Sequence, residues 1–224
     1  MTEIPGSRPW IIAVLNRKGG VGKTTTVLSL AAAIADSSGD VEVHDVDPQQ
    51  SAYEISQMGL LPFRVKRARS AAELLAIRDV RGPDTILLDL PGNLDDTPVV
   101  GEVLAVTDFA IIPVVPERAA VTPTQQTAQI VAGRNLPYRV LLNLVDPLRG
   151  DGPADQLRAL LDGMGLRYFR GAIRRYVAYP QSQLNGEAIT AYRGRAWKEA
   201  TEDVRKVQIE LLLELGRLAQ GAAV

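Results

Sequence analysis

The sequence predicts an α/β fold in which a mostly parallel, twisted β-sheet is flanked by helices on both faces. Short apolar runs alternate with amphipathic segments from Trp10 onward, the order expected of repeated β-α units. The chain has 224 residues, enough for one large domain, and is 46% hydrophobic and 23% charged, as ordinary globular proteins are. Because no repeat, low-complexity tract or long linker divides it, we predict one domain over residues 10–219, with flexible segments at residues 1–9 and 220–224.

Each predicted element follows from hydrophobic spacing. Apolar runs of strand length predict strands at residues 10–16, 41–46, 63–67, 85–90, 109–115, 139–145 and 168–173. Helical spacing predicts helices at residues 24–36, 71–77, 122–132, 154–161 and 197–218. In the last helix, an apolar stripe is expected to pack onto the sheet. This stripe consists of Trp197, Ala200, Val204, Val207, Leu211, Leu215 and Leu218.

Composition narrows the classes of function. The formal net charge is −1, so any affinity for nucleic acid must come from a local basic patch. The absence of cysteine excludes thiolate chemistry, structural cysteine-zinc sites and iron-sulfur clusters, and it fits a reducing compartment. The N-terminal segment lacks the apolar core of a signal peptide, and no run approaches the roughly 18 apolar residues of a membrane span. We therefore expect a cytoplasmic protein that does not bind membranes.

The most informative segment lies between the first strand and the first helix, where residues 16–25 read Asn-Arg-Lys-Gly-Gly-Val-Gly-Lys-Thr-Thr. Its glycines let successive backbone N–H groups converge on phosphate oxygens, and the helix that follows adds the positive end of its dipole. Lys23 supplies a point charge for the β- and γ-phosphates of a nucleotide, and Thr24 is placed to bind Mg²⁺ through its hydroxyl. The predicted nucleotide-binding loop consists of Gly19, Gly20, Val21, Gly22, Lys23, Thr24 and Thr25.

Two acidic segments complete the predicted site. Asp45 and Asp47 come at the end of the second strand, so both carboxylates are expected on the same side of its C-terminal end, where open α/β sheets bind ligands. Alternatively, they only begin a turn before the proline that follows. Asp89 ends an apolar strand and is expected to hold Mg²⁺ through water. Gly92 is placed for its backbone N–H to sense a γ-phosphate, which makes residues 93–96 a predicted conformational switch.

A strict G-x-x-x-x-G-K-[ST] motif fails because Arg17 occupies the first glycine position. From Lys18 onward, Lys-Gly-Gly-x-Gly-Lys-Thr-Thr resembles the deviant Walker A box of the ParA/MinD family of P-loop ATPases. The resemblance implies that Lys18 reaches across a nucleotide-sandwich homodimer to the partner's phosphates, whereas otherwise it is a solvated surface lysine. It also implies that Asp45 contacts the hydrated magnesium and that Asp47 positions or activates the attacking water. The implied catalytic set is Lys18, Lys23 and Asp47.

Predictions also follow for three further residues. Asn143 and Pro180 are similar to family positions near adenine, although each alone fits a strand end or a turn equally well. His44 is the only histidine in the chain, and we expect it to be a strand residue without a catalytic task.

The resemblance covers nearly the whole chain and implies a short-form ParA, similar to ParF. The implied activity is hydrolysis of ATP to ADP and phosphate by an ATP-bound dimer, stimulated by a ParB-like adaptor or centromere-binding protein during plasmid or chromosome partition. Non-specific DNA binding, with nucleoid association in the ATP-bound state, would require a basic surface. The candidates are Arg174, Arg175, Arg193, Arg195 and Lys198, which otherwise are solvated side chains on scattered loops.

Other functions fit the same predicted site. The cargo of a ParA-like positioning ATPase could equally be a carboxysome, a chemotaxis cluster or a transfer-DNA complex. A MinD-like membrane cycle would need a basic amphipathic C-terminal helix, whereas residues 211–219 continue the core stripe and Glu210 and Glu214 are acidic. Redox and metalloid-transporting members of the fold would need cysteines, and a biotin-pathway synthetase fits the Asp-x-Asp-Pro-Gln segment less well than a switch ATPase.

Overall fold

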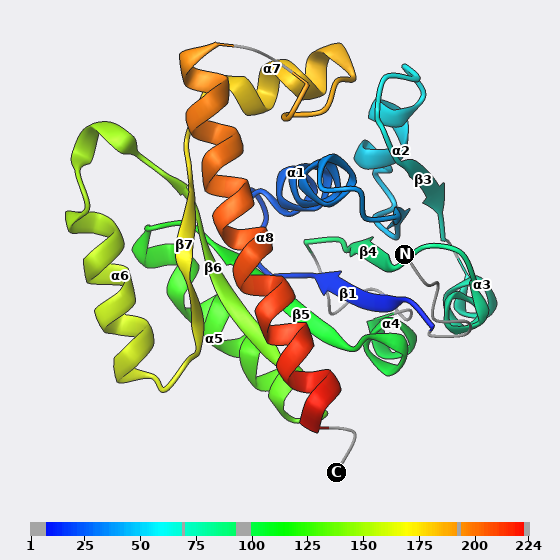
Figure 1. The fold of residues 1–224 in the computed structure, drawn as a ribbon. Coiled ribbons are helices and arrows are strands. Elements are labelled where there is room, and N and C mark those ends of the chain that lie inside the picture. The colour runs from blue at the N-terminus through cyan, green and yellow to red at the C-terminus, as the bar shows by residue number, and fades with distance from the viewer. Residues whose placement is uncertain (1–7, 69, 93–99, 192–193, 222–224) are drawn as a thin grey trace.

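A computed structural model describes residues 8–68, 70–92, 100–191 and 194–221. The described residues form one seven-stranded sheet in the order β3-β2-β4-β1-β5-β6-β7, and every neighbouring pair is parallel (Figure 1). The strands are β1 (Trp10–Val14), β2 (Val41–Asp45), β3 (Arg64–Arg67), β4 (Thr85–Asp89), β5 (Phe109–Val114), β6 (Tyr138–Val145) and β7 (Tyr168–Arg174). The α-helices are α1 (Lys23–Asp36), α2 (Ser51–Ser56), α3 (Ala71–Ala76), α4 (Val100–Val106), α5 (Arg118–Ala132), α6 (Gly152–Gly163), α7 (Ala178–Asn185) and α8 (Arg195–Gly221), with short 3₁₀ turns at Ile77–Asp79 and Pro147–Arg149.

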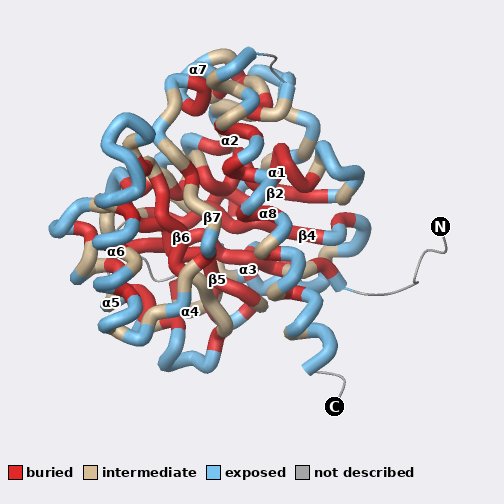
Figure 2. Tube along the Cα trace, turned by 60° about the vertical axis from the view of Figure 1, so that its left-hand side comes forward, coloured by how far each residue is buried: buried red, intermediate tan, exposed pale blue. Residues whose placement is uncertain are grey.

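Helices cover both faces of the sheet, as predicted. Within β1, Ile11 and Ala13 are fully buried against the layer that contains α3, α4, α5 and α6, whereas Ile12 and Val14 are fully buried against the layer that contains α1, α2, α7 and α8. Strands covered in this way are apolar at successive positions, which explains the uninterrupted apolar runs in the sequence. The central strands accordingly lie in the buried interior, whereas the outer sides of the helices and the edge strand β3 are exposed (Figure 2). The predicted fold class is confirmed.

The predicted strands are all present, with ends that differ by at most two residues. Three helices were not predicted, namely α2, α4 and α7, which have six, seven and eight residues. Segments of one or two turns are too short to show a helical hydrophobic period. Pro180 is the third residue of α7, where its missing N–H costs no intrahelical hydrogen bond. Helix α5 begins four residues before the predicted start and contains Pro123 in its interior.

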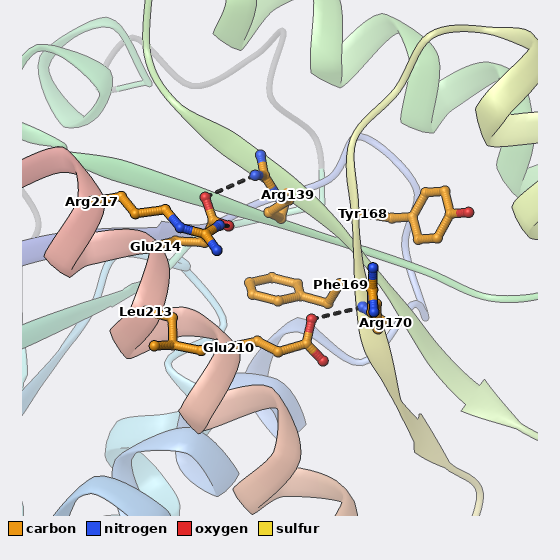
Figure 3. Close-up of a pocket in the computed structure, with 8 residues that line it drawn as sticks. All are labelled: Arg139, Tyr168, Phe169, Arg170, Glu210, Leu213, Glu214 and Arg217. Carbon is orange, nitrogen blue, oxygen red and sulfur yellow. Dashed lines mark hydrogen bonds and ion pairs between the residues drawn. The ribbon is translucent and has the colours of Figure 1, made fainter. Parts of the chain in front are cut away.

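The last helix packs onto the sheet, as its apolar stripe predicted. Ala200, Val204, Val207, Leu211 and Leu215 are buried in the same core as α1. Helix α8 also covers the edge strand β7. Figure 3 shows Glu210 of α8 beside this strand, where its carboxylate accepts hydrogen bonds from the backbone N–H groups of Arg170, at 2.8 Å, and Gly171, at 2.6 Å. These contacts occupy N–H groups that an edge strand would otherwise present to another chain.

A groove of about 510 Å³ lies between β7 and α8, near the amino-terminal ends of β6 and β7 (Figure 3). Glu214 of α8 forms ion pairs across it with Arg139 and within the helix with Arg217, both at 2.8 Å. The predicted phosphate loop follows the carboxyl end of β1, at the opposite edge of the parallel sheet. The groove is therefore separate from the predicted nucleotide site.

The two ends of the chain are partly described. Residues 1–7, most of the segment predicted to be flexible, lie outside the described residues, but Arg8 forms a bidentate ion pair with Asp108 at 2.7 Å. At the other end, α8 continues to Gly221, so residues 220 and 221 belong to the helix. Within the described ranges, none of the helices combines the length and the apolar character needed to cross a membrane.

Candidate functional site

The predicted phosphate loop joins the carboxyl end of β1 to the start of α1. Gly20 and Gly22 adopt left-handed backbone conformations with φ of 76° and 80°, which glycine tolerates at little cost. A Cβ atom on Gly22 would lie 2.5 Å from Nδ2 of Asn143, so the position also lacks space for a side chain. The loop leads directly into α1, which begins at Lys23. The unpaired N–H groups of the first turn of this helix point toward the loop. This is the backbone arrangement of an anion-binding turn.

Asn16 fixes the entry to the loop. Its amide nitrogen donates to the carbonyl of Pro113, at 2.8 Å, and to Oγ1 of Thr124, at 2.9 Å. Its side-chain oxygen Oδ1 accepts the backbone N–H of Lys18 at 3.0 Å. The backbone N–H of Arg17 donates to Oγ1 of Thr127 at 3.1 Å. The first part of the loop is thus tied to β5 and α5, which keeps its remaining N–H groups available for a ligand.

Asn143 of β6 supports the second half of the loop. It is fully buried, and its amide nitrogen donates to the carbonyl of Val21, at 2.8 Å, and lies 3.3 Å from the carbonyl of Gly22. The same nitrogen is 3.2 Å from Oγ1 of Thr26. These contacts satisfy loop carbonyls that would otherwise be buried without a donor. The amide nitrogen is therefore used within the chain, and no contact in the structure tests the predicted role of Asn143 near adenine, which stays a prediction.

The side chain of Lys23 is buried inside the loop. Its side chain is only 8% exposed, and Nζ lies 3.5 Å from the carbonyl oxygen of Asn16. Burial lowers the pKa of Lys23, while the charges of Asp89 and Asp47 oppose that change. Gly92 lies against the same loop, because a Cβ built on it would be 3.4 Å from both Nζ of Lys23 and Cα of Gly19. The structure therefore brings the predicted sensor glycine to the lysine, while residues 93–96 lie outside the described residues.

Asp89 lies at the level of the loop, at the carboxyl end of β4. It pairs in register with Val14 of β1 and with Asp45 of β2, so three strand ends meet here. Asp89 is 1% exposed, and within the described part of the chain neither of its carboxylate oxygens has a hydrogen-bond partner of good geometry. Burial raises the pKa of Asp89 to about 7, and the nearby Thr24 hydroxyl opposes the rise. A buried carboxylate of this kind needs a cation or a proton to compensate it.

A magnesium ion fits this arrangement. The free oxygens of Asp89 and the hydroxyl of Thr24 are hard oxygen donors, which Mg²⁺ prefers. The described residues contain no cluster of three or more acidic, histidine or cysteine side chains that could enclose a metal alone. The remaining ligands would have to be water and phosphate oxygens, as is usual for Mg²⁺ bound together with a nucleotide.

The two aspartates at the end of β2 differ from the prediction in geometry. The strand ends at Asp45, and Asp47 lies in the turn that follows, so the two do not project from one regular strand. Asp45 is buried, and its carboxylate accepts the backbone N–H groups of Tyr53, at 2.9 Å, and Asp47, at 3.1 Å. Burial raises the pKa of Asp45, and these backbone donors oppose the rise. Asp45 thus fixes the turn into α2, and its contact with hydrated magnesium remains a prediction.

The acidic group of Asp47 is partly exposed and accepts the backbone N–H of Gln49 at 2.9 Å. Its charge acts on both Lys23 and Asp89, which places it near the loop. His44 lies on β2 with Nε2 2.6 Å from Oε1 of buried Glu42, consistent with the structural role predicted for it. Asp47 thus lies near the loop, and its role in positioning the attacking water stays a prediction.

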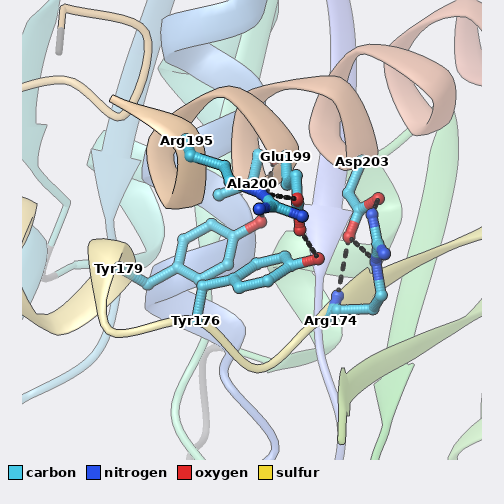
Figure 4. Close-up of polar contacts among 7 residues, drawn as sticks. All are labelled: Arg174, Tyr176, Tyr179, Arg195, Glu199, Ala200 and Asp203. Atoms are coloured by element: carbon cyan, nitrogen blue, oxygen red, sulfur yellow. Dashed lines mark hydrogen bonds and ion pairs between the residues drawn. The ribbon is translucent and has the colours of Figure 1, made fainter. Parts of the chain in front are cut away.

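Of the basic residues predicted to bind DNA, Arg195 and Lys198 lie in the first turns of α8, and Arg174 lies beside the same part of the helix (Figure 4 shows Arg174 and Arg195). Arg174 forms a bidentate pair with buried Asp203, at 2.8 and 2.7 Å, and this pairing raises the pKa of its guanidinium. Its charge is therefore largely neutralised within the chain. Arg195 is 94% exposed and Lys198 is 79% exposed, with weak ion pairs to acids one helical turn away. Arg175 is exposed, and Arg193 lies outside the described residues.

Tyrosines fix this end of α8. Tyr176 donates its hydroxyl hydrogen bond to Glu199 at 3.0 Å, and Tyr179 donates to the carbonyl of Ala200 at 3.1 Å (Figure 4). Burial raises the pKa of Tyr176 to about 12, so its hydroxyl stays protonated as a donor. Pro180 follows directly and is exposed on α7, and the structure neither places it at a ligand nor excludes it from one.

Comparison with known proteins identifies the family. The CobQ/CobB/MinD/ParA nucleotide binding domain matches residues 12–189. The chain belongs to this family. The membership confirms the predicted P-loop ATPase of the ParA/MinD type and agrees with the loop geometry described above.

Individual relatives of the CobQ/CobB/MinD/ParA family differ in their functions. The maintenance of carboxysome distribution protein A of Gloeobacter kilaueensis is 36% identical over 210 residues, which cover 92% of this chain and 95% of the relative. The chromosome-partitioning ATPase Soj of Thermus thermophilus is 28% identical, over 86% of this chain and 94% of Soj. The structure of the septum site-determining protein MinD of Pyrococcus horikoshii, complexed with Mg-ADP, matches with a TM-score of 0.68 and 18% identity over 88% of this chain and 94% of MinD. This structural similarity supports the fold.

Sequence reasoning missed the residues that support the loop. Asn16 was part of the quoted motif but received no role, although a polar residue directly after a buried apolar strand was a usable signal. Thr124 and Thr127 lie on α5, more than a hundred residues away from the loop in sequence. Gln183 of α7 donates to Oγ1 of Thr25 at 2.9 Å, and no local sequence pattern predicts that contact.

Proposed function

We propose that the chain is an ATPase that binds Mg-ATP at the loop 16–25, dimerises in the ATP-bound state and uses hydrolysis to ADP and phosphate to switch back. The observation that carries this proposal is the buried carboxylate of Asp89, whose oxygens have no hydrogen-bond partner of good geometry among the described residues and which interacts with Lys23 and Thr24. A magnesium ion with a bound triphosphate would satisfy all three groups at once. Membership of a nucleotide-binding family supports the same assignment.

Each residue of the proposed site has one task. The glycine-rich loop binds phosphate oxygens through its backbone N–H groups, and Lys23 adds a charge that burial keeps close to the phosphates. Thr24 and Asp89 hold the metal, and bound Mg²⁺ supplies neutralisation of phosphate charge. Asp47 orients water for attack, and Asp45 fixes the turn on which Asp47 lies. Lys18, which is partly exposed at the mouth of the loop, would contact the phosphates of a second copy.

The functional result of the cycle is a change between dimer and monomer. Contacts to the γ-phosphate would favour the closed dimer, and their loss after hydrolysis would release it. Gly92 is the described residue best placed to register the γ-phosphate, because its backbone faces Lys23. Slow turnover, accelerated by an adaptor protein, suits a protein whose dimer lifetime sets the timing of transport.

The proposed cellular role is ATP-driven positioning of a large cargo, with non-specific DNA as the surface on which the dimer is retained. The 36% identity over nearly the whole chain to a carboxysome distribution protein supports a protein-organelle cargo. A second candidate, chromosome or plasmid partition with a ParB-like adaptor, is supported by the 28% identity to Soj. Both roles need the same nucleotide cycle and a basic surface on the dimer.

DNA retention tests the step that the two roles share. Wild-type protein with Mg-ATP should be retained on non-specific duplex DNA, and retention should fall steeply as salt increases. Simultaneous replacement of Arg195 and Lys198 by alanine should weaken it, while Arg217→Ala, an exposed arginine at the other end of α8, serves as the matched control. Equal retention of all three proteins would remove the start of α8 from the proposed DNA surface.

The cargo requires an experiment in cells. In a strain that lacks the gene, a carboxysome role predicts clustered carboxysomes and unchanged plasmid inheritance. A partition role predicts rapid plasmid loss or cells without chromosomes. Complementation with Lys23→Ala should fail in either case, because both roles depend on nucleotide binding.

A further inference from the structure

Thr25 differs from four other threonines, which lie in or directly after helices, in how it uses its hydroxyl. Thr26, Thr107, Thr124 and Thr127 each donate to the carbonyl four residues earlier, the usual bond for a threonine inside a helix. For Thr25, the contact found among the described residues is one in which its oxygen accepts, from Nε2 of Gln183 at 2.9 Å. A hydroxyl that accepts from an amide still has a hydrogen to donate.

Thr25 lies where its hydroxyl hydrogen can point toward the phosphate loop. Thr25 is the third residue of α1, two positions after Lys23, so it belongs to the first helical turn, where unpaired N–H groups point at the loop. Among the described residues, the hydroxyl of Thr25 makes no hydrogen bond to the carbonyl of Val21, four residues earlier, which accepts from Asn143. Within that part of the chain, its hydrogen therefore has no acceptor, and it lies at the phosphate-binding end of the helix.

Gln183 is itself firmly placed. It lies on α7, where Ser182 donates to the carbonyl of Tyr179 at 2.8 Å and the hydroxyl of Tyr179 anchors the helix to α8. The helix ends at Gly186, whose left-handed φ of 69° and contact with Met58 leave no room for a Cβ. The amide thus reaches Thr25 from a scaffold that is separate from the phosphate loop.

We infer that Gln183 is a positioning residue for nucleotide binding. It holds the oxygen of Thr25 as an acceptor, so that the hydroxyl hydrogen is directed to a phosphate oxygen of the bound nucleotide. This inference rests on the proposed nucleotide site and adds α7 to it. The contact between α7 and α1 through Gln183 would then depend on whether phosphates are bound.

The test is a double-mutant cycle on the affinity for Mg-ADP, measured by calorimetry on the full chain. Gln183→Ala and Thr25→Val should each weaken binding by roughly two- to tenfold, the range expected for one neutral hydrogen bond. In the Thr25→Val background, Gln183→Ala should have no further effect, because the hydroxyl that it orients is gone. Thr25→Ser keeps the hydroxyl and should preserve the effect of Gln183→Ala.

Two further variants separate positioning from packing. Gln183→Glu can only accept, so it should take the Thr25 hydrogen, repel the phosphates and weaken binding more than Gln183→Ala does. Gln181→Ala removes an exposed glutamine from the same helix and should leave the affinity unchanged. Thermal unfolding without nucleotide should be similar for all variants that are compared.

The outcomes separate this inference from the function on which it rests. If Gln183→Ala weakened Mg-ADP binding equally with and without the Thr25 hydroxyl, or left wild-type affinity unchanged, the positioning role would be wrong and the nucleotide site would stand. If the wild-type chain bound no Mg-ADP at all, the proposed function itself would fail.

Discussion

The buried carboxylate of Asp89 makes a quantitative prediction about stability in the absence of metal. Its pKa is raised from the ordinary value of 3.8 to about 7, because burial outweighs the opposing contact with Thr24 and no described residue forms a hydrogen bond of good geometry with its oxygens. A carboxyl whose pKa is higher in the folded state binds more protons there, so stability is greatest at low pH and falls as pH rises through that window. At 1.36 kcal/mol per pKa unit, the difference of roughly 3 between 3.8 and about 7 corresponds to about 4 kcal/mol.

Asp89→Asn tests this reasoning because the amide has nearly the same shape but cannot ionise. Urea unfolding of both proteins should be measured in EDTA at about pH 5 and about pH 8. Between these pH values, the free energy of unfolding of the variant should rise relative to that of the wild type by about 3 kcal/mol, because most of the pH range over which the two states differ in protonation lies above pH 5. Asp155→Asn, at a side chain that is 66% exposed, is the control and should show no such gain. A wild-type stability that does not fall relative to Asp89→Asn over this range would refute the assignment of an uncompensated buried carboxylate.

Three more predictions follow from the loop and its surroundings. Gly22→Ala should destabilise the fold by about 1–3 kcal/mol in urea unfolding, because φ is 80° and the new Cβ would lie 2.5 Å from Nδ2 of Asn143. Gly19→Ala, where a Cβ meets nothing within 4 Å, is its control, and equal stability of the two variants would contradict this view of the loop. Lys18→Ala should bind nucleotide but remain monomeric in size-exclusion chromatography with ATP, and an unchanged dimer would exclude the cross-subunit role. Asp47→Ala should retain ATP and accumulate as a dimer, and normal phosphate release would show that Asp47 does not orient the water.

The sheet and its covering helices were accessible to sequence reasoning because the strands are short and separated by helices, and the central strands are buried on both faces. Ile11 to Val14, for example, are apolar at every position since both neighbouring layers are helical. The short helices escaped prediction for the converse reason. Helix α2 has six residues and buries only Ala52, so it offers no hydrophobic period to detect.

The candidate site also contains residues that the sequence predicts and residues that only the structure reveals. Residues of the loop and of β4 were predictable because their roles depend on one local segment, as with Lys23 after its glycines and Asp89 at a strand end. The groups that hold the loop in shape come from other parts of the chain. Asn143 and Gln183 act across 122 and 158 residues of sequence, respectively, so only the folded structure reveals their contacts.

Calorimetric titration of the purified chain with Mg-ATP tests the central assignment most directly. The structure predicts saturable binding to one site per chain, lost in Lys23→Ala, whose ammonium group is buried beside the loop. Absence of binding by the wild-type chain, or equal binding by Lys23→Ala, would contradict the nucleotide site and the switch built on it.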